Sequence, residues 1–250
     1  MIHRAVVQGG DEWRRLRLGI PTASNFHRLI TAKKMEPATG RHAYSVELVT
    51  ELIIGQPLDS VVTPAMLHGT DSEAKAVAAY EFEEGLDTAV CGFCTTDDGL
   101  VGASPDRFVG DDGSLEVKCP FKPEIHVGYL LAPDTLREEY WVQVQGQLYV
   151  SGRKWTDLIS YMIGLPMVRV RITPDPKFQE ALTKALGMFL KEHSERIETA
   201  KREGWIKPAA PVADHSADFI SDADVDAIVA AQKSEFAGPH TAGESGTPPL

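Results

Sequence analysis

The chain has 250 residues, of which 43% are hydrophobic and 24% are charged. A chain of this length and composition can bury its own core, which excludes a fully disordered, collagen-like or coiled-coil protein. The net charge of −11 argues against a nucleic-acid partner. However, residues 1–41 carry eight basic and three acidic side chains, whereas residues 209–250 carry one basic and seven acidic side chains, so such a partner stays open.

The first third of the chain is predicted to be mostly helical. Thr22 or Ser24 can cap a helix that continues through Ile30, and a second helix spans 44–54 and ends before a glycine. A third helix starts near Asp71, where apolar residues recur at helical spacing.

After residue 85 the hydrophobic period changes to that of strands. Short alternating or β-branched segments, separated by turn clusters, predict a three-stranded antiparallel meander. Its strands span 88–94, 100–109 and 114–119, and they are followed by a helix at 136–151, strands at 157–163 and 167–173, and a closing helix at 176–203. This order predicts an α/β or α+β fold with a mixed central sheet covered by helices.

Residues 1–208 are predicted to form one domain. Pro208 and Pro211 mark a linker, and residues 221–234 have the spacing of a short acidic amphipathic helix. Residues 237–250 contain three glycines and three prolines without periodicity, and we expect them to be disordered. The segment 209–250 is therefore expected to be an appendage of the domain.

Three features favour a cytoplasmic protein. No apolar run approaches the ~20 residues of a membrane-spanning helix, and residues 1–13 have no secretory signal pattern. The chain has only three cysteines. Cys91 and Cys94 form a C-x₂-C pair, but no fourth metal ligand accompanies them and Cys119, so buried free thiols are favoured over a metal site.

The strongest chemical signal is Asp106, followed ten residues later by Glu116-Val117-Lys118. A hairpin of this length brings the two carboxylates together, and the strand period of two puts Glu116 and Lys118 on one face. Hard oxygen ligands of this kind suit Mg²⁺ or Mn²⁺, which can lower the pKa of a bound water. The alternative is that these residues are ordinary turn and strand-face positions, since the bare spacing is common.

The surrounding sequence resembles the bacteriophage λ exonuclease family of viral recombination nucleases, within the restriction-endonuclease-like fold. The matching blocks occur in the family's order at 4–24, 68–82, 102–121 and 140–150. The resemblance implies a phage or prophage enzyme that digests one strand of linear double-stranded DNA from its 5′ end with Mg²⁺. The 3′ single strand would pass to a single-strand annealing protein, and the enzyme would be a ring-shaped homotrimer.

By the same resemblance, Asp106, Glu116 and the Val117 carbonyl would be metal ligands, and Lys118 would be the catalytic lysine. Glu73 matches a glutamate that the family contributes from the preceding helix, near a second metal or its waters. A rival interpretation of Glu73 is a capping box with Thr70, three residues earlier.

A second group would hold the terminal 5′-phosphate. By the resemblance, Arg17 and Ser24 correspond to the arginine and serine with which the family holds this phosphate, with help from Ser104 before the catalytic aspartate. Thr22 adds a further hydroxyl at the start of the predicted helix. A guanidinium fork and hydroxyl donors suit a phosphate. The alternative for Arg17 is a surface charge beside Arg14 and Arg15.

Three further predictions concern DNA contacts. The family uses a glutamine and a tyrosine of one helix to position the scissile phosphate; here Gln143 or Gln145 and Tyr149 are candidates, and the choice of glutamine stays open. Met66 matches an apolar wedge that separates the strands; the alternative is a methionine packed on the core.

The sequence thus favours a Mg²⁺-dependent 5′→3′ exonuclease that releases 5′-mononucleotides. Two alternatives are kept: a structure-specific endonuclease of the same fold, and a DNA-end-binding protein that has lost catalysis.

Overall fold

The computed structural model describes residues 1–58 and 64–206, with the side chains of residues 64–71 outside the described part. The predicted linker, the acidic helix at 221–234 and the terminal segment lie outside the described residues. No described helix combines the length and apolar character needed to cross a membrane.

The central sheet is mixed, with strand order β2-β5-β6-β7-β8. Strands β6 and β7 pair in parallel, and the other neighbours are antiparallel. The strands span Ala89–Val90 (β2), Arg107–Val109 (β5), Gly113–Lys118 (β6), Trp155–Ser160 (β7) and Val168–Ile172 (β8). The predicted fold class, a mixed sheet with helical cover, is confirmed.

A second sheet of three strands has the order β1-β3-β4, with β1 at Ile2–Arg4, β3 at Phe93–Thr95 and β4 at Gly102–Ala103. The predicted meander was therefore wrong, because segments 88–94 and 100–109 each divide between the two sheets. The first divides at Gly92, which has a φ of 68° and lets the β1 backbone approach closely. The second divides at Pro105, which has no N–H for a ladder. Ser104, Pro105 and Asp106 thus form the passage between the sheets.

The helices are α1 (Asp11–Arg17), the 3-10 helix η1 (Ala23–Arg28), α2 (Arg41–Ile54), α3 (Pro64–Glu84), α4 (Pro123–Leu131), α5 (Pro133–Ser151) and α6 (Pro176–Arg202). The predicted helices corresponding to η1, α2, α5 and α6 are confirmed, with shifted ends. Helix α3 begins seven residues before the predicted start at Asp71, while α1, α4 and strand β1 were not predicted.

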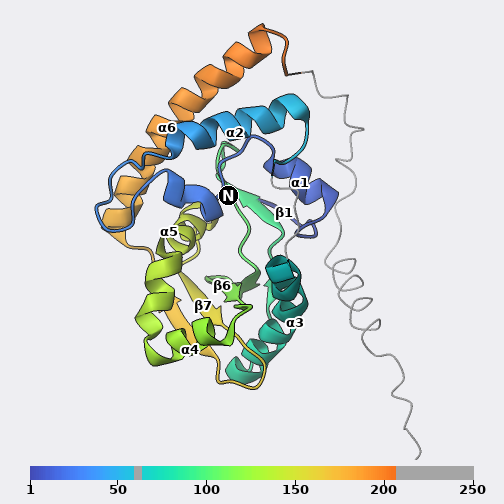
Figure 1. Ribbon diagram of the computed structural model, residues 1–250, viewed down its shortest axis with the longest axis vertical. Coiled ribbons are helices and arrows are strands. Elements are labelled where there is room, and N and C mark those ends of the chain that lie inside the picture. Colours follow the sequence, from blue (N-terminus) through green and yellow to red (C-terminus); the bar gives the residue numbers. More distant parts are fainter. Residues whose placement is uncertain (59–63, 207–250) are drawn as a thin grey trace, which may run out of the picture. The chain divides into compact units, whose positions relative to one another are not determined.

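Helices α3 and α5 flank the central sheet on either side (Figure 1). Leu115, Val117 and Ile159 pack with α3, whereas Leu158 packs with α5. Because side chains alternate along a strand, Glu116 and Lys118 of β6 share the face covered by α5. The alternation of side chains along β6 therefore places a carboxylate and an ammonium group on the face that packs against α5.

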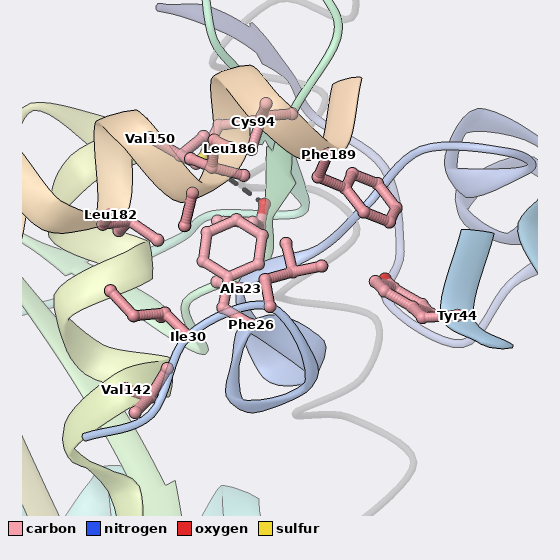
Figure 2. Close-up of a cluster of buried hydrophobic side chains, with 14 of the residues drawn as sticks. Ala23, Phe26, Ile30, Tyr44, Cys94, Val142, Val150, Leu182, Leu186 and Phe189 are labelled. Atoms are coloured by element: carbon pink, nitrogen blue, oxygen red, sulfur yellow. Dashed lines mark hydrogen bonds between the residues drawn. The ribbon is translucent and has the colours of Figure 1, made fainter. Parts of the chain in front are cut away.

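A separate apolar cluster holds η1 against α5 and α6 (Figure 2). Phe26 of η1 lies among residues of both helices, including Val142 and Leu182. Gly146 of α5 permits this approach, since an added Cβ would lie 2.5 Å from Phe26 Cδ2. Cys94 is buried in the same cluster as a free thiol, and Cys91 is also buried and free, as predicted.

Candidate active site

The β5–β6 hairpin brings Asp106 to Glu116. Arg107 pairs with Leu115, so Asp106 lies across from Glu116 at the end of the paired segment. The Val117 backbone N–H donates to Asp106 Oδ2 at 2.7 Å. Glu116 is 3% exposed, so its carboxylate requires hydrogen-bond partners.

Three side chains supply those partners. Lys118 Nζ and Gln143 Nε2 donate to Glu116 Oε1 at 2.7 and 2.6 Å, and Gln147 Nε2 donates to Oε2 at 2.6 Å. Lys118 Nζ also lies 3.3 Å from Gln143 Oε1 and 4.4 Å from the centroid of the Tyr140 ring. The carboxylate and the ammonium are therefore held by side chains of α5.

Helical spacing explains this arrangement. Tyr140, Gln143 and Gln147 are at positions i, i+3 and i+7, so they form one stripe along α5 facing β6. Gln145 lies on another face, where its side chain bonds to the backbone of Thr173 and Asp175. Of the two candidate glutamines, the structure brings Gln143 to the cluster and places Gln145 elsewhere.

Tyr149 is also separate from this cluster, because it packs against the apolar cluster that contains Phe26. Tyr140 is the tyrosine beside Lys118, and Gln147 is a further partner of Glu116; neither was predicted. The spacing of Gln147, four residues after Gln143, was the signal that could have identified it.

Glu73 reaches the region from α3 on the opposite side. Its Oε1 lies 3.5 Å from Arg107 Nη1. Burial raises the pKa of the Glu73 carboxyl. The positive charge of Arg107 lowers this pKa in part, and the negative charge of Glu116 raises it further. The capping-box interpretation was wrong, because α3 begins at Pro64 and both Thr70 and Glu73 lie inside the helix. Met66 is in the same helix, and its side chain is outside the described part.

The carboxylates are crowded enough to perturb one another. Burial raises the pKa of Asp106 well above its ordinary value, and the Glu116 and Glu73 charges raise it further. Burial by itself lowers the pKa of Lys118, but the negative charges of Glu116 and Asp106 have the larger combined effect, so the pKa lies above its ordinary value. Lys118 is therefore an ammonium at neutral pH.

The residues fit a hard divalent cation. Two adjacent carboxylates offer oxygen ligands and a mutual repulsion that a cation would relieve. No group of three His, Cys, Asp or Glu side chains within the described residues is already gathered as a metal-ligand set. Asp106 and Glu116 are thus the core of the candidate set, with Glu73 nearby.

The predicted phosphate-binding residues also converge. Arg17 Nη2 donates to Thr22 Oγ1 at 3.4 Å, and the Thr22 and Ser24 hydroxyl oxygens lie 3.3 Å apart. The Arg17 guanidinium stacks 3.9 Å above the Trp13 ring, and Trp13 Nε1 donates to Ser104 Oγ at 2.9 Å. Trp13 therefore joins Arg17 to Ser104, a link that was not predicted.

Within the described residues, Arg17 forms no ion pair with a carboxylate. No Asp or Glu in the described part of the chain lies within ion-pair distance of its guanidinium. Burial lowers the pKa of the Arg17 guanidinium, while Tyr44 and the more distant Glu51 carboxylate raise it, and the group remains charged. By contrast, neighbouring Arg14 pairs with Asp11 on the surface. A half-buried guanidinium that forms no ion pair among the described residues and lies beside two hydroxyls is suited to an anion.

The two groups of residues share a short stretch of backbone. Gly102 N donates to Pro21 O at 2.9 Å, which ties the segment before η1 to β4. Gln8 Nε2 donates to Pro105 O at 2.9 Å and supports the same passage from the N-terminal segment. The candidate anion-binding group (Arg17, Thr22, Ser24 and Ser104) and the acidic cluster (Asp106, Glu116 and Glu73) are therefore connected through residues 104–106.

Comparisons with known proteins identify the family and the fold. The family model described as the YqaJ-like viral recombinase domain matches residues 12–154. No curated protein sequence matches the chain. The crystal structure of the alkaline exonuclease LHK-Exo from Laribacter hongkongensis has a TM-score of 0.68 and 32% identity, covering 78% of this chain and 98% of its own. Its complex with dAMP matches equally well.

A phage-related exonuclease from Haemophilus somnus 129PT has a TM-score of 0.59 and 12% identity, covering 72% of this chain and 96% of its own. At this identity the similarity concerns the fold alone. The family match at 12–154 includes both the anion-binding group and the acidic cluster.

Proposed function

The chain belongs to the YqaJ-like viral recombinase domain family, and from this premise we propose that it is a metal-dependent exonuclease. It degrades one strand of linear double-stranded DNA from the 5′ end and releases 5′-mononucleotides. The observation that carries the proposal is the convergence of Asp106, Glu116 and Lys118, together with the link from Ser104 through Trp13 to Arg17. The first group suits phosphodiester hydrolysis and the second suits a terminal phosphate.

Asp106, Glu116 and the Val117 carbonyl would hold Mg²⁺ or Mn²⁺, with Glu73 nearby. When bound, such a cation supplies Lewis-acid stabilisation of charge on the phosphate and favours a nucleophilic water. Lys118, held as an ammonium by Glu116, orients that water and stabilises developing negative charge.

Gln143 sits between Glu116 and Lys118, and its amide can turn toward a non-bridging oxygen of the scissile phosphate. Arg17, Thr22, Ser24 and Ser104 bind the terminal 5′-phosphate and hold the first phosphodiester at the acidic cluster. The related LHK-Exo was crystallised with dAMP, a molecule of the product class proposed for this chain.

Two alternatives are less well supported. An endonuclease of the same fold would not need the anion-binding group around Arg17. An inactive end-binding protein would not need the hydrogen bonds that hold Glu116 and Lys118.

The decisive experiment compares three DNA substrates: linear duplex with 5′-phosphate ends, the same duplex with 5′-hydroxyl ends, and a closed circle. Each is incubated with Mg²⁺ or with EDTA. Mg²⁺-dependent loss of the phosphorylated linear form, with release of mononucleotides, supports the proposal. Cleavage of the circle favours the endonuclease, and tight end binding without cleavage favours the inactive module.

The proposal extends to partners. A homotrimer that encircles the duplex would give processive digestion without a strongly basic surface, and sedimentation that finds a monomer at micromolar concentration contradicts it. The 3′ strand would pass to a single-strand annealing protein. Capture of that protein by the full chain, but not by residues 1–208, would assign the contact to 209–250. Equal capture by both would assign it to the nuclease domain.

A further inference from the structure

Gln147 has a hydrogen-bonding pattern that a purely structural glutamine would not need. It is 1% exposed, and its Nε2 donates to Glu116 Oε2 at 2.6 Å. Its Oε1 is buried and has no hydrogen-bond partner among the described residues. One half of the amide therefore serves Glu116, and the other half is left unsatisfied.

The orientation of this amide follows from chemistry. A carboxylate only accepts hydrogen bonds, so the Gln147 NH₂ group must face Glu116 and the carbonyl oxygen must point away. An unsatisfied buried acceptor destabilises the fold, and an apolar side chain of the same shape would avoid it. A glutamine at position 147 is therefore less favourable for the free energy of folding than an apolar side chain would be, and stability alone does not explain its presence.

The geometry around Glu116 shows what the bond accomplishes. Lys118 and Gln143 both donate to Oε1, and Gln147 is the described side chain that donates to Oε2. Without that bond, only the two bonds at Oε1 would oppose rotation of the carboxylate about its terminal torsion, which has weak intrinsic preferences. The bond to Gln147 holds the two oxygens in distinct environments.

We propose that Gln147 is a positioning residue that fixes the rotation of the Glu116 carboxylate, so that Oε1 stays at Lys118 and Gln143. This inference rests on the proposed nuclease function. Gln147 acts through Glu116 and does not itself contact the DNA or a cation.

The test substitutes Gln147→Met, which preserves side-chain length and removes both the bond and the unsatisfied oxygen. We expect kcat on phosphorylated linear duplex to fall about 10- to 100-fold, as for other residues that orient a metal ligand. The KM for DNA ends should stay within about twofold, since the anion-binding group around Arg17 is untouched. The thermal midpoint should change little. An unchanged kcat overturns the proposal.

A matched control removes another glutamine that braces α5. Gln179 of α6 donates to Gln145 O and Oε1 at 2.9 and 2.8 Å, on a face of α5 that does not contact Glu116. Gln179→Met should lower the thermal midpoint and leave kcat unchanged. Equal losses of kcat in Gln147→Met and Gln179→Met would assign Gln147 a merely structural role.

A second readout does not depend on cleavage. Titration of the DNA-free protein with Mn²⁺, followed by electron paramagnetic resonance, should show an affinity about 10- to 100-fold weaker in Gln147→Met than in the unmodified protein. If the unmodified protein binds Mn²⁺ but cuts no DNA, the proposed function fails while the positioning role is still tested. If Gln147→Met does not fold, Gln147→Asn, which is too short to reach Glu116, replaces it under the same criteria.

Discussion

Removal of the Arg17 guanidinium should abolish the preference for phosphorylated DNA ends. The guanidinium lies over Trp13, donates to Thr22 Oγ1 and has no carboxylate partner among the described side chains. A hydrogen bond to a charged group contributes about 1.5–3 kcal/mol. This corresponds to a roughly 10- to 150-fold loss in binding of a 5′-phosphate end for Arg17→Ala. Arg17→Lys should lose less, because it retains the charge but not the planar fork.

The assay compares initial rates on linear duplexes with 5′-phosphate and 5′-hydroxyl ends at low DNA concentration. The ratio of the rate on 5′-phosphate ends to the rate on 5′-hydroxyl ends should fall toward one in Arg17→Ala, because the variant loses only the binding contribution of the 5′-phosphate. Arg15→Ala is the matched control, since Arg15 is exposed on the same helix and bonds only to the Asp11 backbone. If Arg17→Ala slows both substrates equally and preserves the ratio, Arg17 does not recognise the phosphate.

Three further outcomes are expected. Glu116→Gln should eliminate hydrolysis, because an amide cannot replace a carboxylate as a ligand of the cation. Binding to DNA ends in a gel-shift assay should remain. Turnover near the rate of the unmodified protein would contradict the proposed role of Glu116. Gln143→Ala should lower kcat about 10-fold or more, because the variant loses a hydrogen bond to a charged group. Gln145→Met should lower the thermal midpoint and leave kcat unchanged. If Gln145→Met lowers kcat and Gln143→Ala does not, the roles assigned to the two glutamines are exchanged. Gly146→Ala should reduce the free energy of unfolding, measured by urea titration, by about 1–3 kcal/mol, because the alanine Cβ would overlap the Phe26 ring. Unchanged stability would show that the ring can move.

The part of the site that lies on strand β6 was predictable because strand geometry leaves little freedom. Alternation alone places Glu116 and Lys118 on one face, and the hairpin length brings in Asp106. The α5 residues were harder to predict, since this helix buries apolar side chains toward two separate clusters, Val144 with β7 and β8 and Val142 with η1. Its hydrophobic pattern therefore does not reveal which polar face meets β6.

The division of two predicted strands was missed for a different reason. Gly92 and Pro105 were visible in the sequence, but a glycine or a proline inside a strand pattern is as typical of a bulge or an edge as of a change of sheet. The choice depends on β1, which arrives from the N-terminus to pair with β3. Pairing between residues more than 80 positions apart leaves no local pattern to identify.

With the proposed roles of Ser104 and Asp106, the three-residue passage between the sheets would set a distance along the DNA. Ser104 belongs to the group proposed for the terminal phosphate, and Asp106 belongs to the group proposed for the cleaved bond. Two residues of backbone separate them by at most about 7 Å between Cα atoms, a span suited to a single nucleotide step, and Pro105 stiffens the link. In the proposed mechanism, the covalent geometry of this passage would set the length of the released fragment. Lengthening the passage by one residue would then change which phosphodiester is cleaved as well as the rate.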